Sequence, residues 1–238
     1  DASSREGWRI AVSMICSLVR DKERTLQIVR DLDLCDEKTA RVQLMMADRK
    51  LNSVVSTSAG RLFDGASALL GIRKASTFEG EAATALQFRA EEYVKESETD
   101  KNMCRYPQDT CLPSPGWISP AREEGALILQ TDLLFKSLLE RRLKGEDPGR
   151  LAWIFHKLLA DMIIRTCMAV RERRGLDTCA LSGGVFQNTL LLGMVREGLE
   201  KEGFKVLIHS LVPPNDGGIA LGQAAAGLYR KSKGLLDL

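Results

Sequence analysis

The residues best suited to chemistry are two adjacent glycines, Gly183 and Gly184, followed closely by Asn188. Because glycine has no Cβ, a phosphate group could approach this stretch of main chain closely. The amide of Asn188 could either cap the helix that follows or hydrogen-bond the sugar or base of a nucleotide. Neither a GK[ST] sequence nor a GxGxxG pattern is present here, so the turn alone is equally consistent with a tight connection between a strand and a helix.

A second glycine-rich turn carries a carboxylate. Asp216 is followed directly by two glycines and then by an apolar helical pattern. Its side chain could cap that helix, or it could ligate a divalent metal ion that serves a phosphate held at the first turn.

Both turns follow apolar runs of strand length. These runs span residues 178–181 and 205–209, and a helical pattern follows each turn. In α/β sheets, ligands bind at the carboxyl ends of the strands, where the first N–H groups of the next helix lack an internal partner. The pattern therefore favours an anion-binding site at this edge of a sheet.

A third candidate is Asp64, which lies in a helical apolar pattern spanning residues 56–71. Small neighbours, Gly65 and Ser67, leave space beside it. Two interpretations stay open at this point: a solvated carboxylate in a first helical turn, or a carboxylate that contacts a ligand.

The chain divides by composition into three parts. Residues 1–106 are predicted to form a mainly helical lobe, residues 107–120 a Pro-rich crossing segment, and residues 121–238 an α/β nucleotide-binding lobe. Within the last part, Asp147 followed by proline predicts the start of a long helix. A single histidine, His156, lies beside the apolar face of this helix, and we expect a hydrogen-bonded structural residue rather than a ligand there.

Composition excludes several classes of protein. The chain has 238 residues, a net charge of +2 and six cysteines, with no CxxC pair. Its charges are interspersed, and no apolar run reaches the length of a membrane span, so we expect neither a nucleic-acid nor a membrane partner. Reduced thiols in a cytoplasmic protein are expected, and a bridge between Cys104 and Cys111 is disfavoured.

Six sequence blocks resemble one known family. Together they resemble the carboxyl-terminal part of HypF-type carbamoyltransferases, the nickel-iron hydrogenase maturation factors, and they occur in that family's order. The blocks are REGWRIAV (residues 5–12), STSAGRLFDGASALLG (56–71), FEGEAATALQ (78–87), FHKLLAD (155–161), ALSGGVFQN (180–188) and VPPNDGGIALGQAAAG (212–227).

The resemblance implies a fold and a reaction. The fold would be a predominantly helical α/β structure, the second lobe of an actin-like, sugar-kinase-like (ASKHA) domain with a helical N-terminal part. A separate domain of such proteins makes carbamoyl-adenylate from carbamoyl phosphate and ATP. The carbamoyl-transfer domain then passes the carbamoyl group to the C-terminal cysteine of the partner protein HypE, as a step toward the cyanide ligand of iron.

Site residues follow from the resemblance position by position. Distant relatives that transfer threonylcarbamoyl to tRNA carry a similar Gly-x-x-Phe-Asp run, whose aspartate helps to bind the ribose, and that aspartate matches Asp64. A glycine of the same relatives corresponds to Gly80. Their metal ion, which could be zinc, iron or magnesium here, is held by an HxxxH pair and an aspartate that matches Asp216.

Some parts of the family pattern are absent from the sequence. No HxxxH pair occurs, because the two histidines are His156 and His209. The acylphosphatase-like, zinc-binding and adenylate-forming domains are also absent, so we expect a fragment of a longer protein that is inactive by itself. Two alternatives remain open: an O-carbamoyltransferase acting on a small secondary metabolite, or a non-catalytic nucleotide-binding scaffold.

Overall fold

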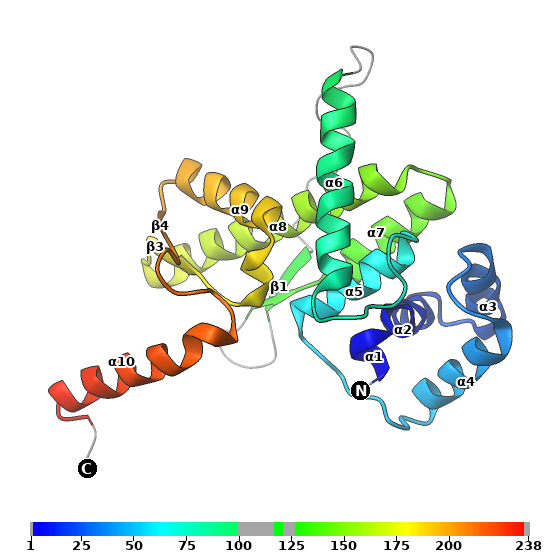
Figure 1. Cartoon of the computed structure of the whole chain (residues 1–238), viewed down its shortest axis with the longest axis horizontal. Helices are drawn as coiled ribbons and strands as arrows, with labels where there is room; N and C mark the ends of the chain where they lie inside the picture. The colour runs from blue at the N-terminus through cyan, green and yellow to red at the C-terminus, as the bar shows by residue number, and fades with distance from the viewer. Residues whose placement is uncertain (1, 100–116, 121–126, 236–238) are drawn as a thin grey trace.

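The computed structural model describes residues 2–99, 117–120 and 127–235 (Figure 1). It is a predominantly helical α/β fold, as the sequence predicts. The helices are α1 (Ala2–Arg5), α2 (Gly7–Val19), α3 (Lys22–Asp31), α4 (Glu37–Asp48), α5 (Ala59–Leu69), α6 (Glu81–Thr99), α7 (Thr131–Leu143), α8 (Pro148–Arg174), α9 (Thr189–Lys201) and α10 (Ile219–Ser232). The strands are β1 (Ile118–Pro120), β2 (Leu127–Leu129), β3 (Thr178–Leu181) and β4 (Lys205–Ile208), and two short 3-10 helices are η2 (Gly184–Gln187) and η3 (Asp216–Gly218).

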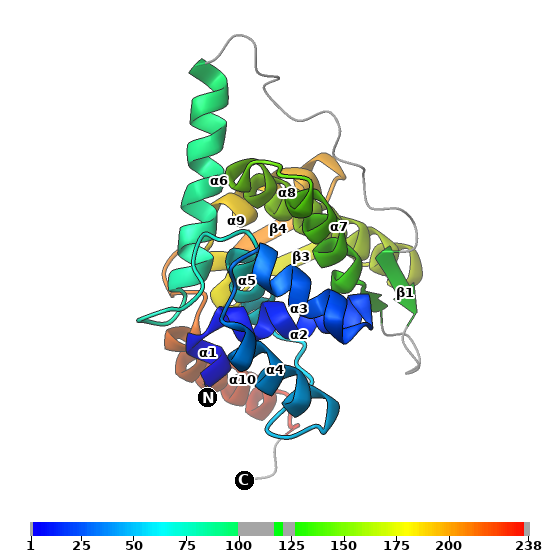
Figure 2. The same cartoon turned by 90° about the vertical axis from the view of Figure 1, so that its right-hand side faces the viewer.

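Helix α8 forms the centre of the fold. Its predicted start is confirmed, because the Asp147 side chain accepts a hydrogen bond from the N–H of Arg150 and proline occupies the first turn. Gly175 ends the helix with φ 68°, a left-handed conformation that glycine adopts without strain. The first half of α8 is buried on nearly all sides, and the helix packs against α6, α7 and α9 (Figure 2).

One apolar core links both predicted lobes. The buried residues of this core extend along the sequence from Trp8 in α2 to Phe204 before β4. Helices α2 and α5 pack against each other, and both contact α7, while α5 also contacts α8. The division into three parts stays a prediction, because residues 107–116 and the pair Cys104 and Cys111 lie outside the described residues. No helix in the described parts of the chain combines the length and the apolar character that a membrane span requires.

The end of the predicted crossing segment is not irregular. Ile118–Pro120 forms β1, which pairs with β2 in antiparallel fashion and places Ile118 opposite Leu129. This apolar pair favours strand formation over a loop. Pro120 is tolerated because it ends a strand of a two-stranded sheet, where a missing N–H costs little.

The predicted strands beside the glycine turns are confirmed. β3 and β4 pair in parallel, with Thr178 opposite Lys205 and Leu181 opposite Ile208. Helix α9 connects them and packs its Leu191 side into the core. Since parallel strands need a crossover connection, this β-α-β unit determines that both following turns emerge at the same edge.

Helix α10 forms as its sequence pattern predicts, but its apolar side is exposed. The pattern predicts an apolar side that includes Ile219 and Leu221. Ile219 is 52% exposed and Leu221 is 59% exposed, and no residue of α10 is buried. Figure 1 shows the helix lying apart from β3 and β4, close to the C-terminus of the chain. Its apolar side is therefore a solvent-facing surface in this structure.

A histidine is enclosed in the core. The ring of His156 is 0% exposed and lies 5.5 Å from the ring centroids of both Phe63 and Phe155. Its Nδ1 donates to the carbonyl oxygen of Ala152 at 2.8 Å, which leaves Nε2 to accept a hydrogen bond from the Asn188 amide at 2.9 Å. Both ring nitrogens are therefore hydrogen-bonded inside the core, which confirms the predicted structural role. Desolvation lowers the pKa of His156 to about 4.

We expect substitution of Gly7 to destabilise the contact between α2 and α5. A Cβ at Gly7 would lie 2.8 Å from the main-chain oxygen of Asp64, and this backbone atom cannot move aside cheaply. Gly7→Ala should lower the free energy of unfolding by roughly 1 to 3 kcal/mol. The matched control is Gly60→Ala, because a Cβ there would meet only the Ser58 hydroxyl at 3.6 Å. Urea denaturation measures both, and equal stabilities would contradict this packing.

We also expect a specific loss of stability in acid. The folded pKa of His156 is about 4 and its ordinary value is 6.5, so the unfolded chain binds more protons between these pH values. The contribution of His156 to the free energy of unfolding is fully present above pH 6.5. It falls by about 3 kcal/mol as the pH drops to about 4, and it changes no further below that pH. His156→Gln keeps an acceptor for Asn188 but cannot titrate.

The measurement is urea denaturation at several pH values between 7 and 4. The parent should lose more stability than His156→Gln over this range, because only the parent carries the buried imidazole ring. Parallel pH profiles for the parent and His156→Gln would show that the buried ring is not the titrating group.

Candidate functional site

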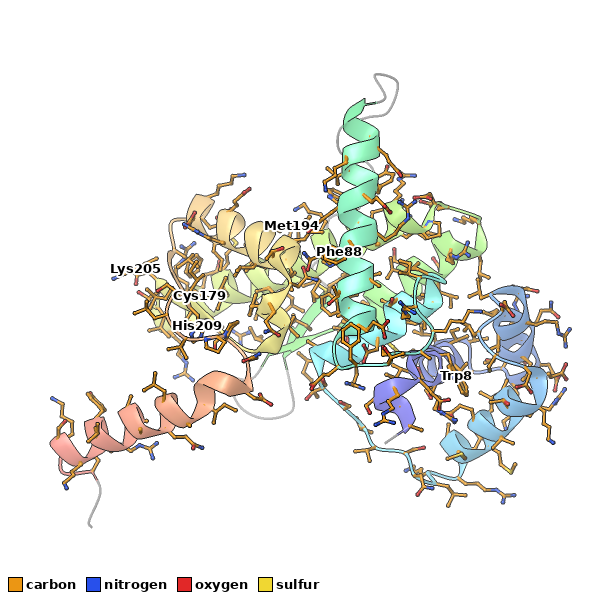
Figure 3. The ribbon with its side chains drawn as sticks, in the orientation of Figure 1. Trp8, Phe88, Cys179, Met194, Lys205 and His209 are labelled. Carbon is orange, nitrogen blue, oxygen red and sulfur yellow. The ribbon has the colours of Figure 1, made fainter. Side chains whose placement is uncertain are left out.

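The two glycine turns are hydrogen-bonded to each other. The N–H of Gly183 donates to the carbonyl oxygen of Pro214 at 2.8 Å, and a second hydrogen bond of 2.8 Å joins His209 Nε2 to the Ser182 hydroxyl. In Figure 3, His209 lies near Cys179, between the β3–β4 pair and α10. The structure therefore brings together the two turns that sequence spacing alone places on separate loops.

Gly183 has a conformation that requires glycine. Its φ is 102°, and no atom lies within 4 Å of the position that a Cβ would occupy there or at Gly184. The main chain of both residues is exposed. A negatively charged group could thus approach this surface without meeting a side chain, as the sequence predicts.

Asn188 has both ends of its amide occupied. Its oxygen accepts from the N–H of Leu191 at 2.9 Å, and its nitrogen donates to His156 at 2.9 Å. The predicted cap of α9 is therefore confirmed. A hydrogen bond between this amide and a nucleotide stays a prediction. To form it, Asn188 would have to give up its hydrogen bond to His156 or to Leu191.

Asp64 is not a solvated carboxylate. It is 7% exposed, because α2 packs across the small residues of α5 through Gly7 and Ile10. Burial raises the pKa of Asp64, while Arg61, whose Nη1 lies 3.3 Å from the carboxylate, acts in the opposite direction. Helix α5 also contacts η2, so this buried carboxylate belongs to an element that touches the first glycine turn.

Gly80 lies at the start of α6 with φ 81°. Its carbonyl oxygen accepts the N–H of Thr84, and the loop before it is held by Glu81. The Glu81 carboxylate accepts from the N–H of Thr77 at 2.6 Å and pairs with Arg73 at 2.8 Å. The Thr77 hydrogen bond is the main reason that the pKa of Glu81 is lowered.

Asp216 does not cap the helix as one interpretation predicts. Asn215 caps the short 3-10 helix η3 instead, because its side-chain oxygen accepts from the N–H of Gly217 at 3.1 Å, and α10 itself has Gly218 at its N-cap with no side-chain hydrogen bond. A Cβ at Gly218 would lie 2.7 Å from the Pro213 carbonyl oxygen, which explains the second glycine of this turn. The Asp216 carboxylate is exposed and remains available to a ligand.

The described residues do not form a complete metal site. Within residues 2–99, 117–120 and 127–235, no cluster of three or more histidine, cysteine or carboxylate side chains could hold an ion. Asp216 would supply one ligand, and a divalent ion needs several.

Sequence inspection missed one contact that holds the site together. The Gln87 amide donates to the Thr189 hydroxyl at 2.8 Å and so joins α6 to the first residue of α9. Both residues lie in or next to sequence blocks of the family pattern, but 102 positions separate them. Nothing in local spacing could have paired them.

Comparison with known proteins agrees with the predicted family and fold. Residues 1–223 match the family described as carbamoyltransferase, Kae1-like domain, second subdomain. A carbamoyltransferase HypF homolog from Cupriavidus necator is 32% identical over 233 residues, which cover 94% of this chain and 53% of that protein. Carbamoyltransferase HypF from Rhodobacter capsulatus is 34% identical over 180 residues, which cover 75% of this chain and 20% of that protein.

A solved structure shows the same fold. Full-length HypF in its phosphate- and nucleotide-bound form superposes with a TM-score of 0.76 at 26% sequence identity, over 94% of this chain and 26% of that one. The chain thus spans about half the length of one curated relative and about a quarter of this solved structure. Matching sequence blocks, matching fold and the family match over residues 1–223 lead to one conclusion: the chain belongs to the HypF-type carbamoyltransferases, and it corresponds to the second subdomain of their Kae1-like domain.

Proposed function

We propose that this chain binds an adenine nucleotide as part of a HypF-type carbamoyltransferase, and that it takes part in passing the carbamoyl group of carbamoyl-adenylate to the C-terminal cysteine of a HypE-type protein. The observation that carries the proposal is the hydrogen bond from Gly183 to Pro214, which joins two open glycine turns at one sheet edge. The nucleotide- and phosphate-bound form of the solved HypF relative supports it.

The phosphate of the adenylate would lie against Gly183 and Gly184. Their main chain is exposed and carries no side chain, and the N-terminus of α9 follows with N–H groups that lack partners inside the helix. The positive end of the α9 dipole favours a negative group at this place.

Asp64 and Gly80 would lie on the ribose side of the nucleotide. An ionised carboxylate accepts hydrogen bonds from two hydroxyl groups, and such bonds are strong where water is largely excluded, as it is around Asp64. Gly80, with no side chain, would allow the sugar to approach the start of α6. Asn188 would act by holding the first turn of α9 in position, or by exchanging its bond to His156 for one to the base.

The proposed transfer forms a C–S bond and breaks a C–O bond. The cysteine thiolate of the acceptor attacks the carbamoyl carbon, and AMP leaves with the electron pair of the broken bond. Main-chain N–H groups at the turn would stabilise the charge that develops on the departing phosphate. Asp216 would supply one ligand to a divalent metal, and the chemistry of such an ion is to neutralise phosphate charge.

We further propose that other domains of a longer polypeptide complete the enzyme. This view is supported by the relatives, of which the chain covers only a part. It is also supported by the chemistry, because adenylate synthesis and a complete metal site need residues that the sequence does not contain. Interspersed charge and reduced cysteines support a cytoplasmic protein that does not use nucleic acid or membranes as partners.

Substitution of Asp64 should weaken nucleotide binding. Asp64→Asn keeps the shape of the side chain and removes its charge, so binding of a nonhydrolysable carbamoyl-adenylate analogue should weaken by about 10- to 100-fold, the equivalent of one charged hydrogen bond. Asp132→Asn, at an exposed carboxylate in the first turn of α7, is the matched control and should bind like the parent.

Titration calorimetry measures the affinity of both variants for the analogue, and Asn188→Ala can be tested in the same way. Circular dichroism must first show that each variant is folded. A folded Asp64→Asn protein with the parent's affinity would remove Asp64 from the proposed site. If the parent itself does not bind the analogue, the nucleotide site as a whole is wrong or needs the missing domains, which a longer polypeptide can test.

The isolated chain should transfer carbamoyl groups slowly or not at all. Water can compete with the thiolate where a cleft lacks its second side. The experiment mixes the chain, preformed carbamoyl-adenylate, a divalent metal and a HypE-type acceptor, and mass spectrometry then follows carbamoylation of the acceptor's terminal cysteine. Efficient transfer that Asp216→Ala abolishes would contradict the view that this site is incomplete.

A further inference from the structure

Two cysteines from different elements contact each other, one of them in the strand that precedes the first glycine turn. Cys167 lies in α8 and Cys179 in β3, and their Sγ atoms are 3.7 Å apart. Both thiols are free and partly buried. In Figure 3, Cys179 lies near Lys205 of β4 and near His209.

We propose that Cys167 and Cys179 form a dithiol site that low-molecular-weight disulfides oxidise to an intramolecular disulfide. The sulfur atoms are at van der Waals separation, and a disulfide requires them to approach from 3.7 Å to about 2.0 Å. The proposal is independent of the nucleotide site, and nothing in the proposed carbamoyl transfer uses either thiol.

The local fold explains why these two sulfurs meet. Gly175, in its left-handed conformation, reverses the chain at the end of α8, so β3 returns beside the last turns of the helix. β3 pairs with β4 alone in the described sheet, so its other edge carries no strand partner.

A metal site at the same place is less well supported. Soft metal ions prefer thiolate ligands, but stable sites generally need three or four of them. Among the residues that the structure describes, no third histidine, cysteine or carboxylate completes such a group. Oxidation needs only the two sulfurs that are already in contact.

The reaction consists of two exchange steps. The Cys179 thiolate attacks one sulfur of R–S–S–R, which forms a mixed disulfide and releases one thiolate RS⁻. Cys167 then loses its proton and attacks the Cys179 sulfur, which forms the Cys167–Cys179 bond and releases the second RS⁻. The two thiolates take up the two protons, so the protein loses two electrons and R–S–S–R becomes two thiols.

Cys167 is suited to the second step rather than the first. Burial and the adjacent Cys179 raise the pKa of Cys167 to about 12, so at neutral pH it is a thiol and a poor nucleophile toward a free disulfide. Once a mixed disulfide is present on Cys179, proximity compensates for the small thiolate fraction.

The test exposes the folded chain to mixtures of reduced and oxidised glutathione. Free thiols are then blocked with N-ethylmaleimide at low pH, and trypsin separates the two cysteines into peptides 166–171 and 175–196. Mass spectrometry should find these peptides linked, at a level at least about 10-fold above any disulfide of Cys16 or Cys35 in the same sample. Cys16→Ser, at another partly buried thiol, is the matched control and should leave the link unchanged.

Single substitutions give the proposal its sharpest test. Cys167→Ser should trap glutathione on Cys179, whereas Cys179→Ser should leave Cys167 largely unmodified. The link should also drop to the level of random pairing when the reaction is run in urea, because the contact belongs to the folded state. Recovery of both peptides with separate blocking groups or separate glutathione, from folded parent protein, would overturn the proposal.

Discussion

The structure depends on the burial of the first half of α8. A helix whose apolar side chains point in all directions must be surrounded, and α8 meets this constraint by packing against α6, α7 and α9. These helices precede and follow α8 in the sequence, and all of them contribute to one core. Phe155 of α8 is fully buried in this core, where its ring contacts Phe63 of α5.

The same constraint positions the candidate site. His156 lies within the buried half of α8 and reaches the amide of Asn188, which caps the next helix. The core thereby determines where α9 begins, and the start of α9 determines where the Gly183 turn lies. The main chain of the turn is thus oriented from inside the protein, although the turn itself is exposed.

Local patterns predicted the elements that depend on local chemistry. The strand at residues 178–181, the cap at Asp147 and the cap at Asn188 follow from short-range spacing, and the structure contains them. The burial of Asp64 could not be predicted in this way, because it depends on α2 crossing above it at Gly7. The same holds for the contact of Gln87 with Thr189, which joins residues distant in sequence.

Two features show the limit of local patterns. The prolines around Ile118 predict an irregular segment, yet an apolar partner in β2 is enough to form a short strand. Periodicity correctly predicts helix α10 and its apolar side, but it does not show whether a packing partner is present, and this side is exposed. In both, the outcome depends on a second segment that a local pattern does not contain.

The hydrogen bond between His156 and Asn188 has a consequence for how such sequences can diverge. Replacing the histidine alone by an apolar residue would leave the buried amide nitrogen without an acceptor, and replacing the asparagine alone would leave the ring nitrogen without a donor. Single changes at either position are therefore costly, while a simultaneous exchange for two apolar residues would also remove the cap of α9. Among related sequences, positions 156 and 188 should accordingly be inherited as a pair, and a departure at one should coincide with a departure at the other.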